Sequence, residues 1–239
     1  MGSMEQNRIF LPSLGTSNWR SFIADPFVHW RRGKSAWELA VSWEIAAKTA
    51  SGMPTELVSA LNSNPDLIGA DLLFAVPEHR VSLDDYRRPS QSDLWVVLWT
   101  RKGYISVTIE AKAGEDFDQP IEKWIKQESD GKERRLAFLT KELGLSEPPP
   151  GFIRYQLVHR TVAALLEAKR CHFNLALMLV QSFEESPSSW LDYERFATLL
   201  RIPAIRGGIT GPTQIDNISL YLGWVDSQKA TDTQASAAV

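Results

Sequence analysis

A single cysteine, Cys171, occurs in the 239 residues. An internal disulfide and a zinc site built from cysteines are therefore excluded, and a reducing compartment is favoured. The four histidines lack the spacing of zinc ligands, so a zinc hydrolase is not indicated. The sequence also contains no signal-peptide core and no apolar run of transmembrane length. We therefore expect a soluble, cytoplasmic protein.

Positive charge is not in excess either. The chain has 26 Lys and Arg against 29 Asp and Glu, a net charge of -3, so a nucleic-acid surface would have to be a local patch. Signatures of Ser or Cys nucleophiles are absent, and the glycine-rich stretch 207–211 lacks the Lys of a phosphate-binding loop. The hydrophobic content of 44% is typical of a globular domain.

The order of the predicted elements indicates a mixed α/β domain. We expect helices over 35–51, 55–62, 119–143, 153–170 and 190–200, a hairpin within 92–112, and strands over 71–76, 174–182 and 218–225. Residues 5–33 are predicted to be irregular, 77–91 a polar connector and 207–212 a loop.

One domain is expected over 5–226. Residues 1–4 look like a cloning scar, and 227–239 have the composition of a disordered tail. The proline run 148–150 is interpreted as a loop, because neither side of it holds enough predicted strands for a sheet of its own.

The hydrophobic pattern of the hairpin assigns its two faces. A two-residue turn at Lys102-Gly103, with glycine supplying positive φ, makes one face wholly aliphatic. The other face then carries Asp93, Glu110 and Lys112, with Asp93 directly opposite Lys112. Directly opposed Cβ atoms lie about 5 Å apart and diagonal ones about 7 Å. Three charges therefore converge at one end of the predicted sheet.

These charges suit a metal site. Two carboxylates at this separation repel each other unless a positive charge lies between them. Mg²⁺, with Mn²⁺ as its substitute, is held by one or two carboxylates together with waters and substrate phosphates, and Asp93 and Glu110 are such ligands. Lys112 would orient or deprotonate the attacking water. The alternative is an ordinary salt bridge between Asp93 and Lys112 at an exposed sheet end.

The motif resembles that of the PD-(D/E)XK nuclease superfamily, whose fold is that of restriction endonucleases. It stands here as Ser92-Asp93, sixteen intervening residues and Glu110-Ala111-Lys112, after a helix that bears Glu, and Ser92 replaces the proline of the named pattern. The resemblance covers roughly residues 35–182, and the stretch 154–160 (RYQLVHR) is similar to a bacterial branch of the superfamily.

The resemblance implies a central mixed sheet flanked by helices. It also implies Mg²⁺-dependent hydrolysis of nucleic acid, in which the Asp and the Glu bind the metal and the Lys assists the water. A glutamate of the first helix often completes the site in that superfamily. Glu38 lies on a mostly polar stripe of the predicted helix, whereas Glu44 lies on an apolar one and needs a partner or a metal. Glu44 is therefore the expected metal ligand, and an ion pair with Lys48 is the alternative.

Substrate contacts are expected from the helix that follows the proline run. Gln156 and Arg160 share a helix face with His159 nearby, and these residue types commonly contact phosphates, although a solvated face is the alternative. Some nucleases of this kind use a Gln downstream of the Lys, a position that Gln119 would fill. Gln119-Pro120 equally marks a helix start, which is the interpretation we favour.

Two functions remain open. The first is a Mg²⁺-dependent nuclease acting on nucleic acid, preferably DNA; the second is a non-catalytic nucleic-acid-binding or oligomerising module on the same fold. An enzyme needs Asp93, Glu110 and Lys112 to open onto a concave, positive cleft, whereas a module would have them occluded or paired with each other. Trp95 and Trp99 share their face, so a helix, a second copy of the chain in a homodimer, or substrate must cover it.

Overall fold

The computed structural model describes residues 15–23, 25–84, 88–126, 130–231 and 233. The helices are α1 (Thr16–Trp19), α2 (Pro26–His29), α3 (Ser35–Ala46), α4 (Thr55–Ser63), α5 (Ile121–Ile125), α6 (Asp130–Glu142), α7 (Tyr155–Arg170) and α8 (Ser189–Leu199). The strands are β1 (Asp71–Val81), β2 (Ser90–Thr100), β3 (Gly103–Ala113), β4 (Leu175–Glu184), β5 (Gly208–Ile215) and β6 (Ile218–Asp226).

The six strands form one mixed sheet in the order β1-β2-β3-β4-β6-β5. Strand β4 lies parallel to both β3 and β6, and the other neighbouring pairs are antiparallel. This confirms the expected mixed α/β class with helices flanking a central sheet. The sheet takes strands from both sides of the proline run 148–150.

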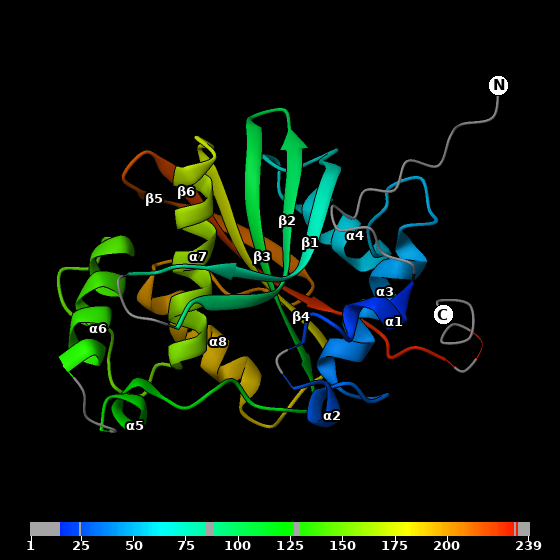
Figure 1. The fold of residues 1–239 in the computed structure, drawn as a ribbon. Coiled ribbons are helices and arrows are strands. Elements are labelled where there is room, and N and C mark those ends of the chain that lie inside the picture. Colours follow the sequence, from blue (N-terminus) through cyan, green and yellow to red (C-terminus); the bar gives the residue numbers. More distant parts are fainter. Residues whose placement is uncertain (1–14, 24, 85–87, 127–129, 232, 234–239) are drawn as a thin grey trace.

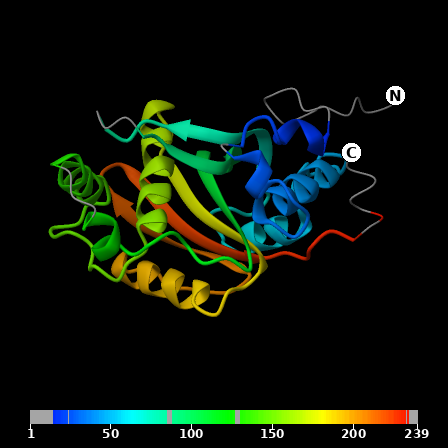
Figure 2. The ribbon, with the colours of Figure 1, turned by 60° about the horizontal axis from the view of Figure 1, so that its bottom comes forward.

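Helices cover both faces of the sheet (Figures 1 and 2). Helices α3 and α4 pack on one face, and α6, α7 and α8 share the core on the other. Strand β4 is buried on both sides: Leu177 and Leu179 belong to the first core, and Met178 and Val180 to the second. This explains why residues 175–180 form a continuous apolar run rather than an alternating one.

Several element boundaries differ from the predictions. Strand β5 was predicted as a loop because of its glycines and proline; it lies at the sheet edge and has a register break between Thr210 and Thr213, where such residues are tolerated. Strand β1 continues to Val81 through the predicted connector. The predicted helix 119–143 is divided into α5 and α6, and the first long helix ends at Ala46 rather than at Ser51.

The predicted cloning scar, residues 1–4, lies outside the described residues, which begin at residue 15. Most of the second half of the predicted tail 227–239 also lies outside them. The beginning of the predicted tail is nevertheless attached to the domain. Ser227 Oγ accepts a hydrogen bond from Gln181, and the Ala230 backbone N–H donates to Glu38 at 2.8 Å. No helix in the described part of the chain has both the length and the apolar character that a membrane crossing requires.

The predicted register of the β2–β3 hairpin is wrong by two residues. Thr100 pairs with Gly103, so the turn is Arg101-Lys102, and Asp93 is not opposite Lys112. The Thr100 hydroxyl stabilises the turn by donating to the Gly103 carbonyl and accepting from the Lys102 N–H. A shift of two keeps every side chain on its predicted face, because the side-chain period of a strand is two.

The close approach of β4, β6 and β5 predicts the effect of one substitution. A Cβ atom added at Gly223 would lie 2.5 Å from Leu179 Cδ1 and 2.9 Å from Ile209 Cγ1. We expect Gly223→Ala to lower the free energy of unfolding by about 1–3 kcal/mol through overpacking, measured by urea denaturation. Ser219→Ala on the same strand should change it by less than about 0.5 kcal/mol. Equal stabilities of the two variants would contradict this packing argument.

Candidate functional site

The candidate site lies where β2 and β3 separate. Their paired register ends at Leu94 and Ile109; beyond it, β2 continues along β1, while β3 continues along β4. Figure 1 shows the ends of β1 and β2 bending away from β3 and across α7. At this fork the carboxylate of Asp93 accepts the backbone N–H of Ala111 at 2.7 Å. The side chain thus satisfies a donor that the ladder no longer pairs.

Three carboxylates stand at the same level on three neighbouring strands. The pairs Pro77–Leu94 and His79–Ser92 flank Glu78 and Asp93, which places these two residues side by side on β1 and β2. Glu110 directly follows Ile109, the last residue of β3 that pairs with β2, and it lies near Asp93, because burial and then the charge of Glu110 raise the pKa of Asp93. Glu78 has φ 53°, a conformation that costs free energy for a residue other than glycine and often marks a functional constraint.

Glu110 is the centre of a buried hydrogen-bond network and exposes only 2% of its surface. Its Oε1 accepts from Lys112 Nζ at 2.8 Å and from Gln156 Nε2 at 2.6 Å. Its Oε2 accepts from Arg160 Nε at 2.6 Å. Gln156 Oε1 accepts in turn from Lys112 at 3.1 Å. Strand β3 and helix α7 are therefore joined at this carboxylate by one ion pair, from Arg160, and one hydrogen bond, from Gln156.

The electrostatics differ sharply among the three acids. Burial alone raises the pKa of Glu110, but the adjacent charges of Lys112 and Arg160 outweigh it and hold that pKa below its usual value. Burial and the neighbouring charges of Glu110 and Glu78 raise the pKa of Asp93 well above its usual range. Burial raises the pKa of Glu78 to about 7, although Gln91 donates a hydrogen bond to it. Positive charge is thus scarce on the Asp93–Glu78 side of the site.

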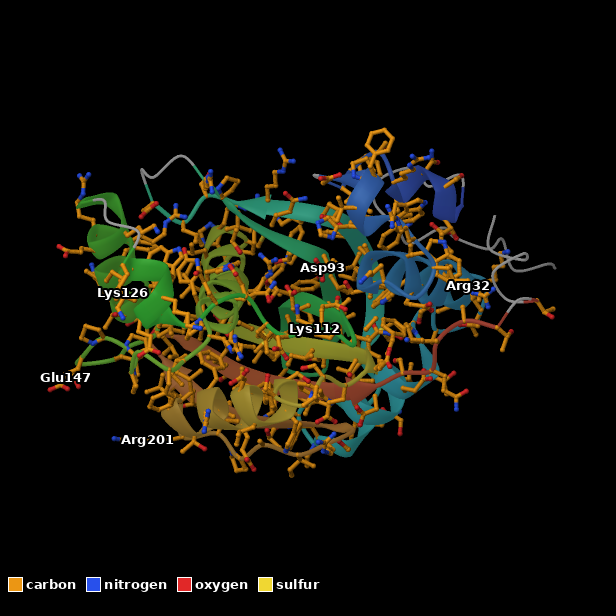
Figure 3. All side chains as sticks on the ribbon, turned by 90° about the horizontal axis from the view of Figure 1, so that it is seen from below. Arg32, Asp93, Lys112, Lys126, Glu147 and Arg201 are labelled. Carbon is orange, nitrogen blue, oxygen red and sulfur yellow. The ribbon has the colours of Figure 1, made fainter. Side chains whose placement is uncertain are left out.

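The three acids line a cavity of about 470 Å³, which we call the carboxylate cavity. Lys112, Gln156 and Arg160 also line it, as do Ile23 and residues between 28 and 36. Figure 3 shows Asp93 and Lys112 near each other in the middle of the underside of the molecule. The labelled residues Arg32, Lys126, Glu147 and Arg201 lie toward its periphery.

The structure brings together most, but not all, of the predicted site residues. Asp93, Glu110, Lys112, Gln156 and Arg160 all line the carboxylate cavity. Helix α7 supplies the last two from one face, as their i,i+4 spacing indicated.

The other three predicted residues lie elsewhere. Glu44 accepts a hydrogen bond from Trp19 Nε1 at 2.7 Å and does not line the carboxylate cavity. His159 and Gln119 line a second cavity. Gln119 immediately precedes Pro120, the residue before α5, which is the structural alternative considered for it.

Glu78 was not predicted as a site residue. Its segment was interpreted as a polar connector, because Pro77 and the charged residues after it interrupt the apolar pattern of the preceding strand. The available signal was the residue itself: a lone acid directly after an apolar strand that precedes the hairpin. Its position in the site nevertheless depends on β1 pairing with β2.

The oxygen donors of the site fit Mg²⁺, provided that water and phosphate supply part of its coordination shell. No three acidic, His or Cys side chains within the described ranges form a group that could hold a metal ion by themselves. Mg²⁺ needs only one or two carboxylates, with waters and phosphate completing its shell. Asp93 can supply one oxygen, and Glu110 Oε2 keeps a lone pair beside the single hydrogen bond from Arg160. A divalent cation would also relieve the repulsion that raises the pKa values of Asp93 and Glu78.

A family model described as a domain of unknown function, DUF6946, matches residues 12–229. Neither the curated proteins nor the solved structures contain a match to the chain.

The raised pKa of Glu78 predicts how stability depends on pH. A carboxyl group whose pKa increases from 4.5 to about 7 on folding binds its proton more tightly in the folded state. Its contribution to stability is therefore lost as pH rises through that interval. In EDTA, we expect the wild type to lose up to about 3 kcal/mol more unfolding free energy between pH 4.5 and 8 than Glu78→Gln does. Urea denaturation measures this, with exposed Glu147→Gln as the control; parallel pH profiles for wild type and Glu78→Gln would refute it.

Proposed function

The chain belongs to the DUF6946 family, and we propose that it is a Mg²⁺-dependent nuclease that hydrolyses phosphodiester bonds in nucleic acid, preferably DNA. The observation that carries this proposal is the row of Glu78, Asp93 and Glu110 beside Lys112 in one cavity. Hard oxygen ligands next to an ammonium group suit activation of water against a phosphate. The cavity of about 470 Å³ leaves room for a hydrated ion and a phosphate.

The resemblance to PD-(D/E)XK nucleases supports the proposal. Asp93 and Glu110-Ala111-Lys112 lie on adjacent strands of a mixed sheet flanked by helices, as the resemblance implied. One feature departs from that pattern: the first-helix glutamate that often completes such sites is replaced by Glu78 from strand β1. We therefore assign Asp93 and Glu110 as the metal ligands and Glu78 as the third carboxylate of the site.

Each residue of the site has a role in this reaction. Bound Mg²⁺ would supply stabilisation of the charge that develops on the phosphate and would acidify a water. Lys112 has three N–H donors, and Glu110 and Gln156 take two of them, so the third is held in a defined direction to orient the attacking water. Arg160 keeps Glu110 ionised, and Lys34 in the lining of the cavity can neutralise an entering phosphate.

A cytoplasmic location accords with this function and with the single cysteine. A homodimer is part of the proposal, because the chain itself buries only one of the two hairpin tryptophans that share a face. Trp95 is buried within the chain by the stacked ring of His79, but Trp99 is 42% and neighbouring Tyr104 48% exposed.

One observation favours the second candidate, a non-catalytic nucleic-acid-binding or oligomerising module. Both oxygens of Glu110 already accept hydrogen bonds from Lys112, Gln156 and Arg160. In a module this network would simply join β3 to α7, and neither metal binding nor cleavage would follow. Direct measurement of metal binding distinguishes the two functions.

We expect the wild type to bind Mg²⁺ and Mn²⁺ and to cleave DNA, and Asp93→Asn to lose both properties. The amide keeps the size of the carboxyl group but removes the charge that a hard cation requires. Isothermal titration with each metal, followed by incubation with single- and double-stranded DNA, measures the two properties. Glu147→Gln removes an exposed carboxylate elsewhere and should behave as the wild type does. A wild type that binds no metal and leaves both DNAs intact would instead indicate the module.

Lys112→Met should separate metal binding from chemistry. We expect cleavage to slow by about 10²–10⁴-fold, the usual contribution of a positioned proton-transfer group. Metal affinity should stay equal or increase, because Glu110 retains Arg160 and loses a competing cation. Single-turnover cleavage and metal titration measure both quantities, with exposed Lys141→Met as the control. Cleavage within tenfold of the wild-type rate would exclude this role for Lys112.

A further inference from the structure

A second cavity, of about 250 Å³, adjoins the carboxylate cavity, and we call it the basic cavity. It lies between the start of β2, residues of helices α5 and α6, and the first turns of α7. Its principal side chains are Arg88, Lys132, Arg135, Trp124, Tyr155 and His159. None of these residues has a role in the proposed hydrolysis.

The side chain of Arg160 connects the linings of the two cavities. Arg160 donates from Nε to Glu110 at 2.6 Å and from Nη1 to Ser90 Oγ at 3.0 Å. Glu110 lines the carboxylate cavity, whereas Ser90 lines the basic one. One guanidinium therefore contacts the linings of both cavities, so a ligand group bound in one lies near the other.

Among the described residues that line the basic cavity, cations outnumber acids. Arg135 forms an ion pair with Asp84, which largely neutralises its charge. Arg135 also donates a hydrogen bond to the Arg88 carbonyl and so holds the backbone of Arg88 in place. Arg88 is exposed, and the ammonium of Lys132 lies 5.2 Å above the Trp124 ring while donating to the Trp124 carbonyl. Of the described lining residues, the acid is Asp118.

Helix α7 adds to this positive potential. Tyr155, its first residue, lines the basic cavity, and the helix is 16 residues long. The N-terminus of such a helix carries about half a positive charge and favours anions.

His159 presents a neutral donor. Ser90 Oγ accepts a hydrogen bond from Arg160 and lies 2.9 Å from His159 Nδ1. The hydroxyl proton of Ser90 is therefore available for donation to Nδ1. This arrangement puts the imidazole proton on Nε2. Burial and the charges of Arg160, Arg135 and Lys112 lower the pKa of His159 well below its usual value, so the ring stays neutral. A neutral ring donates one hydrogen bond without repelling the neighbouring cations.

We propose that the basic cavity binds a phosphate group, and that in a nucleic-acid strand it holds a backbone phosphate close to the one that is cut. Arg88 and Lys132 supply the charge, His159 supplies a neutral donor, and the dipole of α7 adds positive potential. The second half of the proposal rests on the proposed nuclease function. The first half does not, because phosphate binding requires neither metal nor cleavage.

The test uses the full chain in EDTA, so that no strand is cut. Inorganic phosphate and a nucleoside monophosphate are titrated by calorimetry, and a labelled single-stranded oligonucleotide is titrated by fluorescence anisotropy. The variant is Arg88→Gln/Lys132→Gln. The matched control, Lys123→Gln/Lys141→Gln, removes two exposed charges from α5 and α6 outside the basic cavity. Circular dichroism establishes that each variant is folded.

We expect phosphate binding by the wild type and the control, and its loss in the variant. The variant should also bind the oligonucleotide about tenfold more weakly than the control, as removal of charge-assisted hydrogen bonds predicts. The slope of log affinity against log salt should become shallower by about 0.7 for each backbone phosphate that the variant no longer neutralises.

Other outcomes are equally decisive. No phosphate binding by the wild type, or equal binding by variant and control, overturns the phosphate site. Loss of phosphate binding with unchanged oligonucleotide affinity retains the site but overturns its role on a nucleic-acid strand. If both bindings behave as expected and Mg²⁺ still produces no cleavage, the nuclease function fails and the basic cavity stands as a nucleic-acid contact.

Discussion

The candidate site depends on how a fully buried carboxylate, Glu110, is kept charged. Removing such a group from water costs several kcal/mol, which must be recovered from partners with good geometry. Lys112 from the same strand, together with Gln156 and Arg160 from α7, provides them. Because these partners come from two elements, the network also determines how α7 docks on the sheet. The atoms that dock α7 on the sheet are therefore the same atoms that the proposed chemistry would use.

The fork between β2 and β3 provides the space for this chemistry. Strand β3 pairs with β2 on one side and with β4 on the other. Strand β2 leaves β3 where Asp93 and Glu110 lie, whereas β4 stays paired with β3 beyond this point. Backbone groups released at the divergence require other partners, and the Asp93 carboxylate is one of them. A strained Glu78 on β1 completes the row. The arrangement brings three carboxylates together with the charges of Lys112 and Arg160 in the lining of one cavity.

The local pattern was sufficient to predict the faces of the hairpin and the sharing of one helix face by Gln156 and Arg160. Both follow from short periods, two residues in a strand and 3.6 in a helix. The same periodicity was insufficient for the register, because a shift of two leaves every face unchanged. Glu44 was selected for lying on an apolar stripe, and in the structure its carboxylate accepts a hydrogen bond from the Trp19 ring, away from the carboxylate cavity. Burial of an acid indicates a partner but does not identify which one.

By itself, the sequence determined the mixed α/β class and the common face of Asp93, Glu110 and Lys112, since both depend on contacts between near neighbours along the chain. Only the tertiary structure decided that Glu78 joins the site and that a basic cavity adjoins it. Those features bring together segments dozens of residues apart, and no local propensity encodes such pairings. They are selected by the packing of the whole sheet against α7, because buried charges are tolerated only where opposite charges from distant segments meet them.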